Sequence, residues 1–164
     1  MTQAVVRCLT KYATFSGRAP RAEYWYFALF CVLISLVLGL VETTINAITG
    51  TADGPTLLSG AFAFVTLVPS LAAGWRRMHD TGRSGLSLFY PLIVLIGIMT
   101  YIAIVIGPEA LSAGEIQATG LNALILTLAF FVALISPILV IWWLTRPSAP
   151  GPNQYGPNPY EVTL

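Results

Sequence analysis

Four long stretches of this sequence are apolar and almost free of charge, at about 24–45, 57–75, 85–106 and 121–144. A helix that crosses the roughly 30 Å hydrocarbon core of a bilayer needs about 20 apolar residues. Only 9% of the residues are charged, against about 25% in a typical soluble domain. We therefore predict an all-α membrane protein with four transmembrane helices, forming a single membrane domain over residues 1–164 with a polar tail at 145–164.

The basic residues all fall on one side of such an arrangement. If the N-terminus lies in the cytoplasm, the N-terminal segment, the segment between the second and third stretches, and the tail hold all eight Lys and Arg residues. The two opposite loops hold only acids, namely Asp53, Glu109 and Glu115. Basic residues favour the cytoplasmic side of a membrane, so we predict that both termini are cytoplasmic.

The connections between the four stretches are short, which predicts that consecutive helices pack as an antiparallel bundle. Small side chains let helix backbones approach each other closely in a membrane. The residues expected to do so are Gly39, Gly60, Ala61, Ala63, Ala72 and Ala73.

Before the first apolar stretch, Val5, Val6, Leu9 and Tyr12 recur at helical spacing. This pattern predicts a short amphipathic helix that lies on the membrane surface. A frayed N-terminal segment is the alternative. The two cysteines, Cys8 and Cys31, stand in different environments and are expected to be free thiols.

Residues 76–85, Arg-Arg-Met-His-Asp-Thr-Gly-Arg-Ser-Gly, concentrate charge between the second and third stretches. A structural role is one reading: Arg76 and Asp80 are four residues apart and can pair on a continuing helix. Gly82 can then end this helix. In this interpretation the arginines are orientation signals and complements to the helix dipole.

The alternative is a binding site for an anion. Guanidinium groups bind phosphate in a bidentate manner, and Gly82 and Gly85 would let backbone N–H groups approach a ligand. Lipid head groups are the nearest phosphates at a cytoplasmic interface. The candidate ligand-binding residues are Arg18, Arg21, Arg76, Arg77, His79, Asp80 and Arg83, supported by Glu23, Gly82, Gly85 and Tyr155. We call the five arginines in this set the arginine platform.

Two further features extend this hypothesis. Arg18 and Arg21 are three apart and would share a helix face, and Glu23 would hold Arg77 or Arg83 through an ion pair. The tail is rich in Pro, Gly and Asn up to Pro159. We expect it to fold back over the arginine platform, with a disordered end as the alternative.

The sequence also argues against several function classes. His79 and Asp80 are adjacent, so on a helix their side chains point about 100° apart, which disfavours an acid–base pair. A single His and scattered acids predict no metal site and no cofactor. The middle of each stretch lacks charge, unlike coupled transporters, and a net charge of +1 predicts no nucleic-acid partner.

Three segments together resemble a known family. They are Phe-Ser-Gly-Arg-Ala-Pro-Arg-Ala-Glu-Tyr-Trp at 15–25, residues 76–85, and Gly-Pro-Asn-Gln-Tyr-Gly-Pro-Asn-Pro at 151–159. In this order they resemble the domain-of-unknown-function family 805 (DUF805), over about residues 12–159. Leu86 departs from the pattern, since relatives often carry an aromatic residue there. The resemblance implies a small protein of the bacterial inner membrane and supplies no reaction or catalytic residue.

Two function classes follow from these observations. The first is a non-enzymatic binding or scaffold protein whose arginine platform holds anionic phospholipid head groups or a phosphate-bearing partner. The second is an oligomeric pore or a transport accessory, which would require a homo-oligomer or another membrane protein as partner. An enzyme that uses His79 is the third and least supported interpretation.

Overall fold

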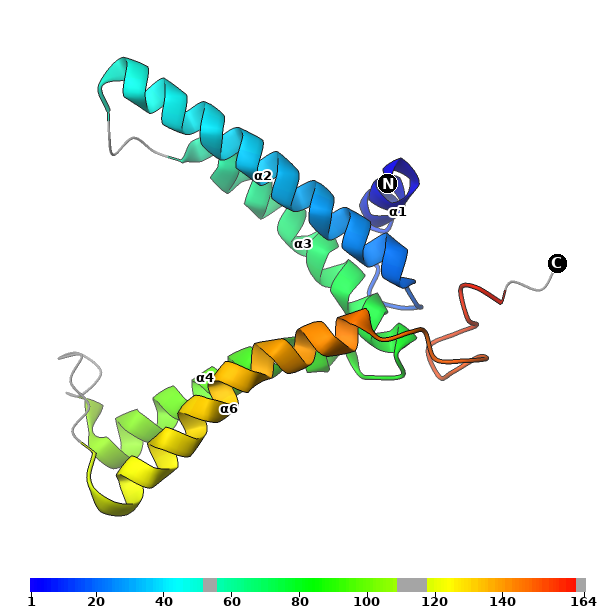
Figure 1. Cartoon of the computed structure of the whole chain (residues 1–164). Helices are drawn as coiled ribbons and strands as arrows, with labels where there is room; N and C mark the ends of the chain where they lie inside the picture. The colour runs from blue at the N-terminus through cyan, green and yellow to red at the C-terminus, as the bar shows by residue number, and fades with distance from the viewer. Residues whose placement is uncertain (52–55, 109–117, 162–164) are drawn as a thin grey trace. The chain divides into compact units, whose positions relative to one another are not determined.

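The computed structural model describes residues 1–51, 56–108 and 118–161, and Figure 1 shows the helices along the chain. The described part of the chain is helical apart from its connections and one isolated bridge between Asn153 and Gly156. The chain divides into two compact units, Met1–Gly85 with Pro147–Leu164 and Leu86–Arg146, each of which is described by itself.

The first unit is built on a long helical hairpin. Helix α2 (Arg21–Thr49) and helix α3 (Leu57–Asp80) run side by side in opposite directions (Figure 1). They contain 29 and 24 residues. At about 1.5 Å per residue, each is longer than the roughly 30 Å hydrocarbon core of a membrane.

Glu42 caps the start of α3 from the neighbouring helix. Its Oε1 accepts hydrogen bonds from the backbone N–H groups of Leu58 (2.5 Å) and Ser59 (3.3 Å). Its Oε2 accepts the Ser59 hydroxyl at 2.5 Å. The first N–H groups of a helix have no partner within the helix. Glu42 supplies one, which explains why this carboxylate is buried between two apolar helices.

Tyr12 provides a hydrogen-bond donor for a backbone carbonyl that Pro69 leaves unpaired in α3. Proline has no N–H group, so the carbonyl of the residue four positions earlier loses its helical partner. Here that residue is Val65, and the Tyr12 hydroxyl donates a hydrogen bond to its carbonyl oxygen at 2.5 Å. The segment before α2 is thereby fixed to the middle of α3.

Helix α1 (Thr2–Thr10) packs against both α2 and α3. It buries Ala4 and Cys8, and Cys8 joins Phe27 and Ala73 in a small apolar core. The expected helix is therefore present. The apolar stripe from which this surface helix was predicted divides, however: Val5 packs against this core, whereas Val6, Leu9 and Tyr12 are exposed.

The second unit is also a helical hairpin. Helix α4 (Tyr90–Tyr101) packs against helix α6 (Gly120–Thr145). A 3-10 turn (Gly85–Phe89, which begins at the end of the first unit) precedes α4 and a π-helical turn (Ile102–Ile106) follows it, which makes a helical stretch of 22 residues. The Tyr101 hydroxyl donates to Asn122 Oδ1 at 3.0 Å. In α6, the Ser136 hydroxyl donates at 3.0 Å to the Ala133 carbonyl, which Pro137 leaves without its helical partner.

The four predicted apolar helices are thus confirmed as Arg21–Thr49, Leu57–Asp80, Gly85–Ile106 and Gly120–Thr145, all long and apolar enough to cross a membrane. The expected close packing of small residues is only partly correct. Ala72 and Ala73 are buried, but Ala61 and Ala63 are exposed. A Cβ atom at Gly39 or Gly60 would meet no neighbour within 4 Å. The acids Asp53, Glu109 and Glu115 lie outside the described residues.

Candidate functional site

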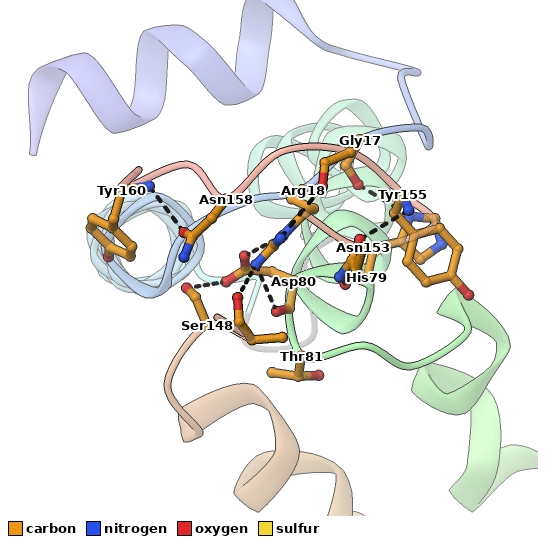
Figure 2. Close-up of polar contacts among 12 residues, drawn as sticks. Gly17, Arg18, His79, Asp80, Thr81, Ser148, Asn153, Tyr155, Asn158 and Tyr160 are labelled. Atoms are coloured by element: carbon orange, nitrogen blue, oxygen red, sulfur yellow. Dashed lines mark hydrogen bonds and ion pairs between the residues drawn. The ribbon is translucent and has the colours of Figure 1, made fainter. Parts of the chain in front are cut away.

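Asp80, the last residue of α3, is the centre of a buried polar cluster (Figure 2). Its Oδ1 accepts a hydrogen bond from Arg18 Nε at 3.0 Å. Its Oδ2 accepts one from Arg77 and another from the Ser148 hydroxyl at 2.5 Å. The backbone carbonyl of Asp80 accepts the Ala149 N–H at 2.8 Å. We call Arg18, Arg77, Asp80 and Ser148 the Asp80 cluster.

Arg18 has no donor left for an external ligand. A guanidinium group has five N–H donors. Those of Arg18 reach Asp80 Oδ1 and the carbonyl oxygens of Asp80, Ala149, Gly151 and Gly156. The expectation that Arg18 and Arg21 share a helix face is wrong, because α2 begins only at Arg21. Arg18 lies in the non-helical segment before it, which lets its side chain reach the end of α3 and the tail.

Arg76 pairs with Glu23 across the hairpin, with 2.5 Å between Nη1 and Oε1. The sequence suggested two different pairings, Glu23 with Arg77 or Arg83 and Arg76 with Asp80. Both suggestions are wrong, because Arg76 is directed to α2 whereas Arg77 is directed to Asp80. The Nε and Nη2 groups of Arg76 are buried and have no hydrogen-bond partner among the described residues.

The tail folds back onto the end of α3, as the sequence suggested. The Asn153 side chain donates to the His79 carbonyl at 3.0 Å, and the Tyr155 ring stacks on the His79 imidazole with 3.7 Å between centroids and 3° between planes. His79 Nδ1 is 3.1 Å from the Gly17 carbonyl oxygen. His79 is therefore enclosed by Gly17 and the tail rather than directed towards the arginines.

The two glycines of the polar segment have different roles. Gly82 has φ of 76° and ends α3, as expected, since this left-handed conformation favours glycine. Gly85 lies directly against the Trp75 ring: a Cβ atom there would be 2.0 Å from Trp75 Cδ2. The need for glycine at this position is thus explained by packing against Trp75. Arg83 donates to the Thr81 carbonyl at 3.2 Å and is half-buried.

The predicted arginine platform therefore separates into two groups. Arg18, Arg76 and Arg77 are at most 8% exposed and are ion-paired with Asp80 or Glu23. Arg21 is exposed and Arg83 half-buried. Burying a charge is costly unless it is paired, and each of the three inner arginines has a carboxylate partner. The inner group can fix the fold, and only the outer residues can meet a ligand at the surface.

Cys8 Sγ lies 3.9 Å from Glu23 Oε1. Burial, and then the negative charge of Glu23, raise the pKa of the Cys8 thiol to about 11. The thiol is therefore protonated near neutral pH and is a poor nucleophile. Within the described ranges, no three His, Cys, Asp or Glu side chains converge as a metal-ligand set.

Sequence reasoning missed the roles of three residues that hold the first unit together. Ser148 completes the Asp80 cluster, Glu42 caps α3 and Tyr12 bonds to Val65. The signal for Tyr12 was available, because Pro69 within an apolar helix requires a donor for the carbonyl four residues earlier. Ser148 and Glu42 carried no comparable local signal, since their partners lie on other segments.

Four helices that are long and apolar enough to cross a membrane define a small multi-pass membrane protein. Residues 12–114 match the family described as "Protein of unknown function (DUF805)", and the chain belongs to this family. It is 34% identical to inner membrane protein YhaH of Escherichia coli (strain K12) over 110 residues, which is 67% of this chain and 88% of the relative. It is 42% identical to inner membrane protein YhaI of the same strain over 88 residues, 52% of this chain and 70% of the relative.

No solved structure gives a significant match to this chain. The family match includes Arg18, Glu23 and residues 76–85, whereas Ser148 and the rest of the tail lie beyond it. The comparisons therefore agree with an inner-membrane protein of a family without an established function.

Proposed function

We propose that this chain is a non-enzymatic scaffold or binding protein of the inner membrane, with both termini in the cytoplasm and its helices in one antiparallel bundle. In this proposal the cytoplasmic face holds anionic lipid head groups or a phosphate-bearing partner. The observation that carries it is the Asp80 cluster, which joins three segments distant in sequence: the residues before α2, the end of α3 and the tail.

The Asp80 cluster supports a scaffold because its bonds hold backbone as well as side chains. Arg18 binds the carbonyl oxygens of Ala149 (2.6 Å) and Gly151 (2.8 Å). The Ala19 N–H donates to the Arg76 carbonyl at 3.0 Å. Buried networks in which the polar groups are satisfied stabilise one particular arrangement of the chain. The connections at this end of the hairpin are thereby held in place as a surface.

The residues that would meet the ligand are the outer cations Lys11, Arg21 and Arg83, which we call the basic face. The first two are exposed and the third is half-buried. Each basic residue near an anionic membrane surface contributes about 1 kcal/mol of attraction. Three such residues give roughly 3 kcal/mol, which corresponds to about a hundredfold preference for anionic over neutral lipid. The inner arginines position this face without touching the ligand.

The absence of a catalytic role is also part of the proposal. Asp80 accepts hydrogen bonds from two arginines and a serine, and His79 is covered by the Tyr155 ring. General acid–base residues must reach a proton on the substrate. Neither side chain is placed to do so in this arrangement.

The test is native mass spectrometry of the protein released from nanodiscs that contain equal amounts of phosphatidylglycerol and phosphatidylcholine. We expect wild type to retain phosphatidylglycerol preferentially. The variant with Lys11, Arg21 and Arg83 all changed to Gln should lose this preference. Arg146→Gln, which removes one exposed cation outside the basic face, should keep it. Equal retention of both lipids by wild type would refute an anionic-lipid site.

The alternative, an oligomeric pore or transport accessory, has one observation in its favour. The Cα atoms of Gly39 and Gly60 face space that no described residue fills, and glycine faces of this kind suit contact with another membrane helix. A solute flux in liposomes together with a stable oligomer in the native mass spectrum would favour this alternative over the scaffold.

A further inference from the structure

A cavity of about 360 Å³ opens between α1, the first turn of α2 and the end of the tail. Its walls include Arg7 of α1, Glu23 and Tyr26 of α2, and Tyr160 of the tail. It is a separate feature of the first unit, because none of the Asp80 cluster and none of the basic face lines it. A bound water occupies about 30 Å³, so the cavity has room for a small polar group of roughly a dozen heavy atoms.

One carboxylate lines the cavity, that of Glu23, and only one of its two oxygens is hydrogen-bonded within the described part of the chain. Glu23 is 5% exposed, and its Oε1 pairs with Arg76. No hydrogen bond to its Oε2 is found within the described part of the chain, although a carboxylate oxygen has two acceptor positions. Since Glu23 lines the cavity, Oε2 is placed to accept hydrogen bonds from a ligand inside it.

The opposite charge comes from α1. Arg7 is exposed, lines the same cavity, and forms no ion pair with any described residue. The rings of Tyr26 and Tyr160 add two aromatic surfaces, which attract ammonium groups. The lining therefore combines a cation, an anion and aromatic faces, a set that matches a molecule with both charges.

The position of the cavity along α2 indicates the depth in the membrane at which a ligand would bind. Glu23 lies in the first turn of α2, and the aromatic run Tyr24-Trp25-Tyr26 begins directly after it. Aromatic residues of this kind mark the level of lipid head groups at the ends of membrane helices. The cavity is thus at the height at which head groups, rather than acyl chains, are found.

We propose that this cavity binds a phosphoethanolamine group, a phosphate ester with a primary ammonium two carbons away. The phosphate is held by Arg7 in a charge-assisted, bidentate contact, and the ammonium donates to Glu23 Oε2 between the two tyrosine rings. A purely anionic group would bring its charge against Glu23, and a purely cationic one against Arg7. The proposal goes beyond the basic face, since it uses a different cavity and other residues.

The same chemistry is available from a membrane lipid and from a soluble ester, which one titration distinguishes. Because the basic face would itself bind phosphatidylglycerol, the titration uses the full chain with Lys11, Arg21 and Arg83 changed to Gln, none of which lines the cavity. This parent protein, in a maltoside detergent, is titrated in a calorimeter with dihexanoyl phosphatidylethanolamine, dihexanoyl phosphatidylglycerol and free phosphoethanolamine. We expect one saturable site that binds the ethanolamine lipid at least tenfold more tightly than the glycerol lipid. Tight binding of free phosphoethanolamine identifies a soluble ester as the source, and weak binding identifies the lipid. Equal affinity for the two lipids, or no saturable binding of any probe, overturns the proposal.

Variants at exposed positions keep the test independent of folding. Arg7→Gln should weaken the binding of the ethanolamine lipid at least tenfold. Ala22→Trp, which places a large ring at the cavity wall, should weaken this binding by the same factor. Arg146→Gln, which removes one exposed arginine outside both the cavity and the basic face, should bind like the parent protein. Glu23→Gln is unsuitable as the main test because it leaves Arg76 without its carboxylate. Unchanged affinity in both Arg7→Gln and Ala22→Trp, each made in the same parent protein, contradicts the assignment.

Discussion

Arg18 and Asp80 are 62 positions apart in the sequence and form an ion pair of 3.0 Å with side chains that are 1% and 0% exposed. Their contact closes the end of the α2–α3 hairpin. It also holds the tail, because the remaining donors of Arg18 reach carbonyl oxygens of Ala149, Gly151 and Gly156. A charge that sequence reasoning would assign to a ligand is thus part of the internal structure.

Asp80→Asn should destabilise the protein strongly. The substitution keeps the shape of the side chain but removes the negative charge that Arg18 and Arg77 share. Breaking a buried ion pair by removing one partner costs about 3–5 kcal/mol. Thermal unfolding in detergent, followed by circular dichroism, measures the loss, and Lys11→Gln as an exposed control should change stability by less than about 0.5 kcal/mol. A melting temperature for Asp80→Asn that equals wild type would contradict the structure of the cluster.

Tyr12→Phe should cost about 1 kcal/mol, the typical contribution of one hydrogen bond. The hydroxyl is the donor for the Val65 carbonyl that Pro69 leaves without a helical partner. The same unfolding experiment measures the effect. Tyr26→Phe is the matched control, since no hydrogen bond of the Tyr26 hydroxyl is found among the residues described. If the two variants are equally stable, the Tyr12 bond is not formed.

Gly85→Ala should disturb the packing of Trp75. The added Cβ would lie 2.0 Å from Cδ2 of the ring, so the indole has to move. Overpacking of this kind costs about 1–3 kcal/mol. We expect a lower melting temperature together with a change in tryptophan fluorescence, whereas Gly97→Ala, where a Cβ meets nothing within 4 Å, should show neither. An unchanged fluorescence spectrum in Gly85→Ala would argue against the Trp75 contact.

Cys8 should resist alkylation in the folded protein. Its thiol is fully buried, and the pKa is raised to about 11 by burial and by the charge of Glu23. The reactive thiolate is therefore scarce at any pH below that value. N-ethylmaleimide at pH 7.5, followed by peptide mass spectrometry, should label Cys8 only after denaturation in SDS. Labelling of the native protein at the rate of a free thiol would be inconsistent with a buried Cys8.

The helices could be predicted from the sequence because each depends on local composition. The four apolar stretches, the end of α3 near Gly82 and the acid in the first turn of α2 all follow from residues within one segment. The apolar stretch at 57–75 covers only part of α3, which continues through the Arg-Arg-Met-His-Asp run to Asp80, as the structural interpretation of residues 76–85 expected. A membrane helix can continue through charged residues at its end when their side chains are ion-paired. Here Arg76 is paired with Glu23 and Arg77 with Asp80.

The partners within the site could not be predicted, because they depend on how segments meet. Arg76 and Arg77 are adjacent in the sequence, yet one pairs with Glu23 of α2 and the other with Asp80. A helix turns about 100° per residue, so neighbours point to different elements. Which element each one meets depends on the rotation of α3 against α2. The role of Ser148 likewise follows from the path of the tail and has no local signature.

The central claim, that Arg18 and Asp80 hold the tail on the end of α3, is tested most directly by hydrogen–deuterium exchange at Ala149. Its N–H donates to the Asp80 carbonyl at 2.8 Å, and because Pro147 and Pro150 lack an N–H, a peptide spanning 147–150 reports almost only on this bond and on Ser148. We predict strong protection in wild type that is lost in Arg18→Gln and kept in Lys11→Gln. Exchange in wild type at the rate of an unstructured peptide would contradict the account.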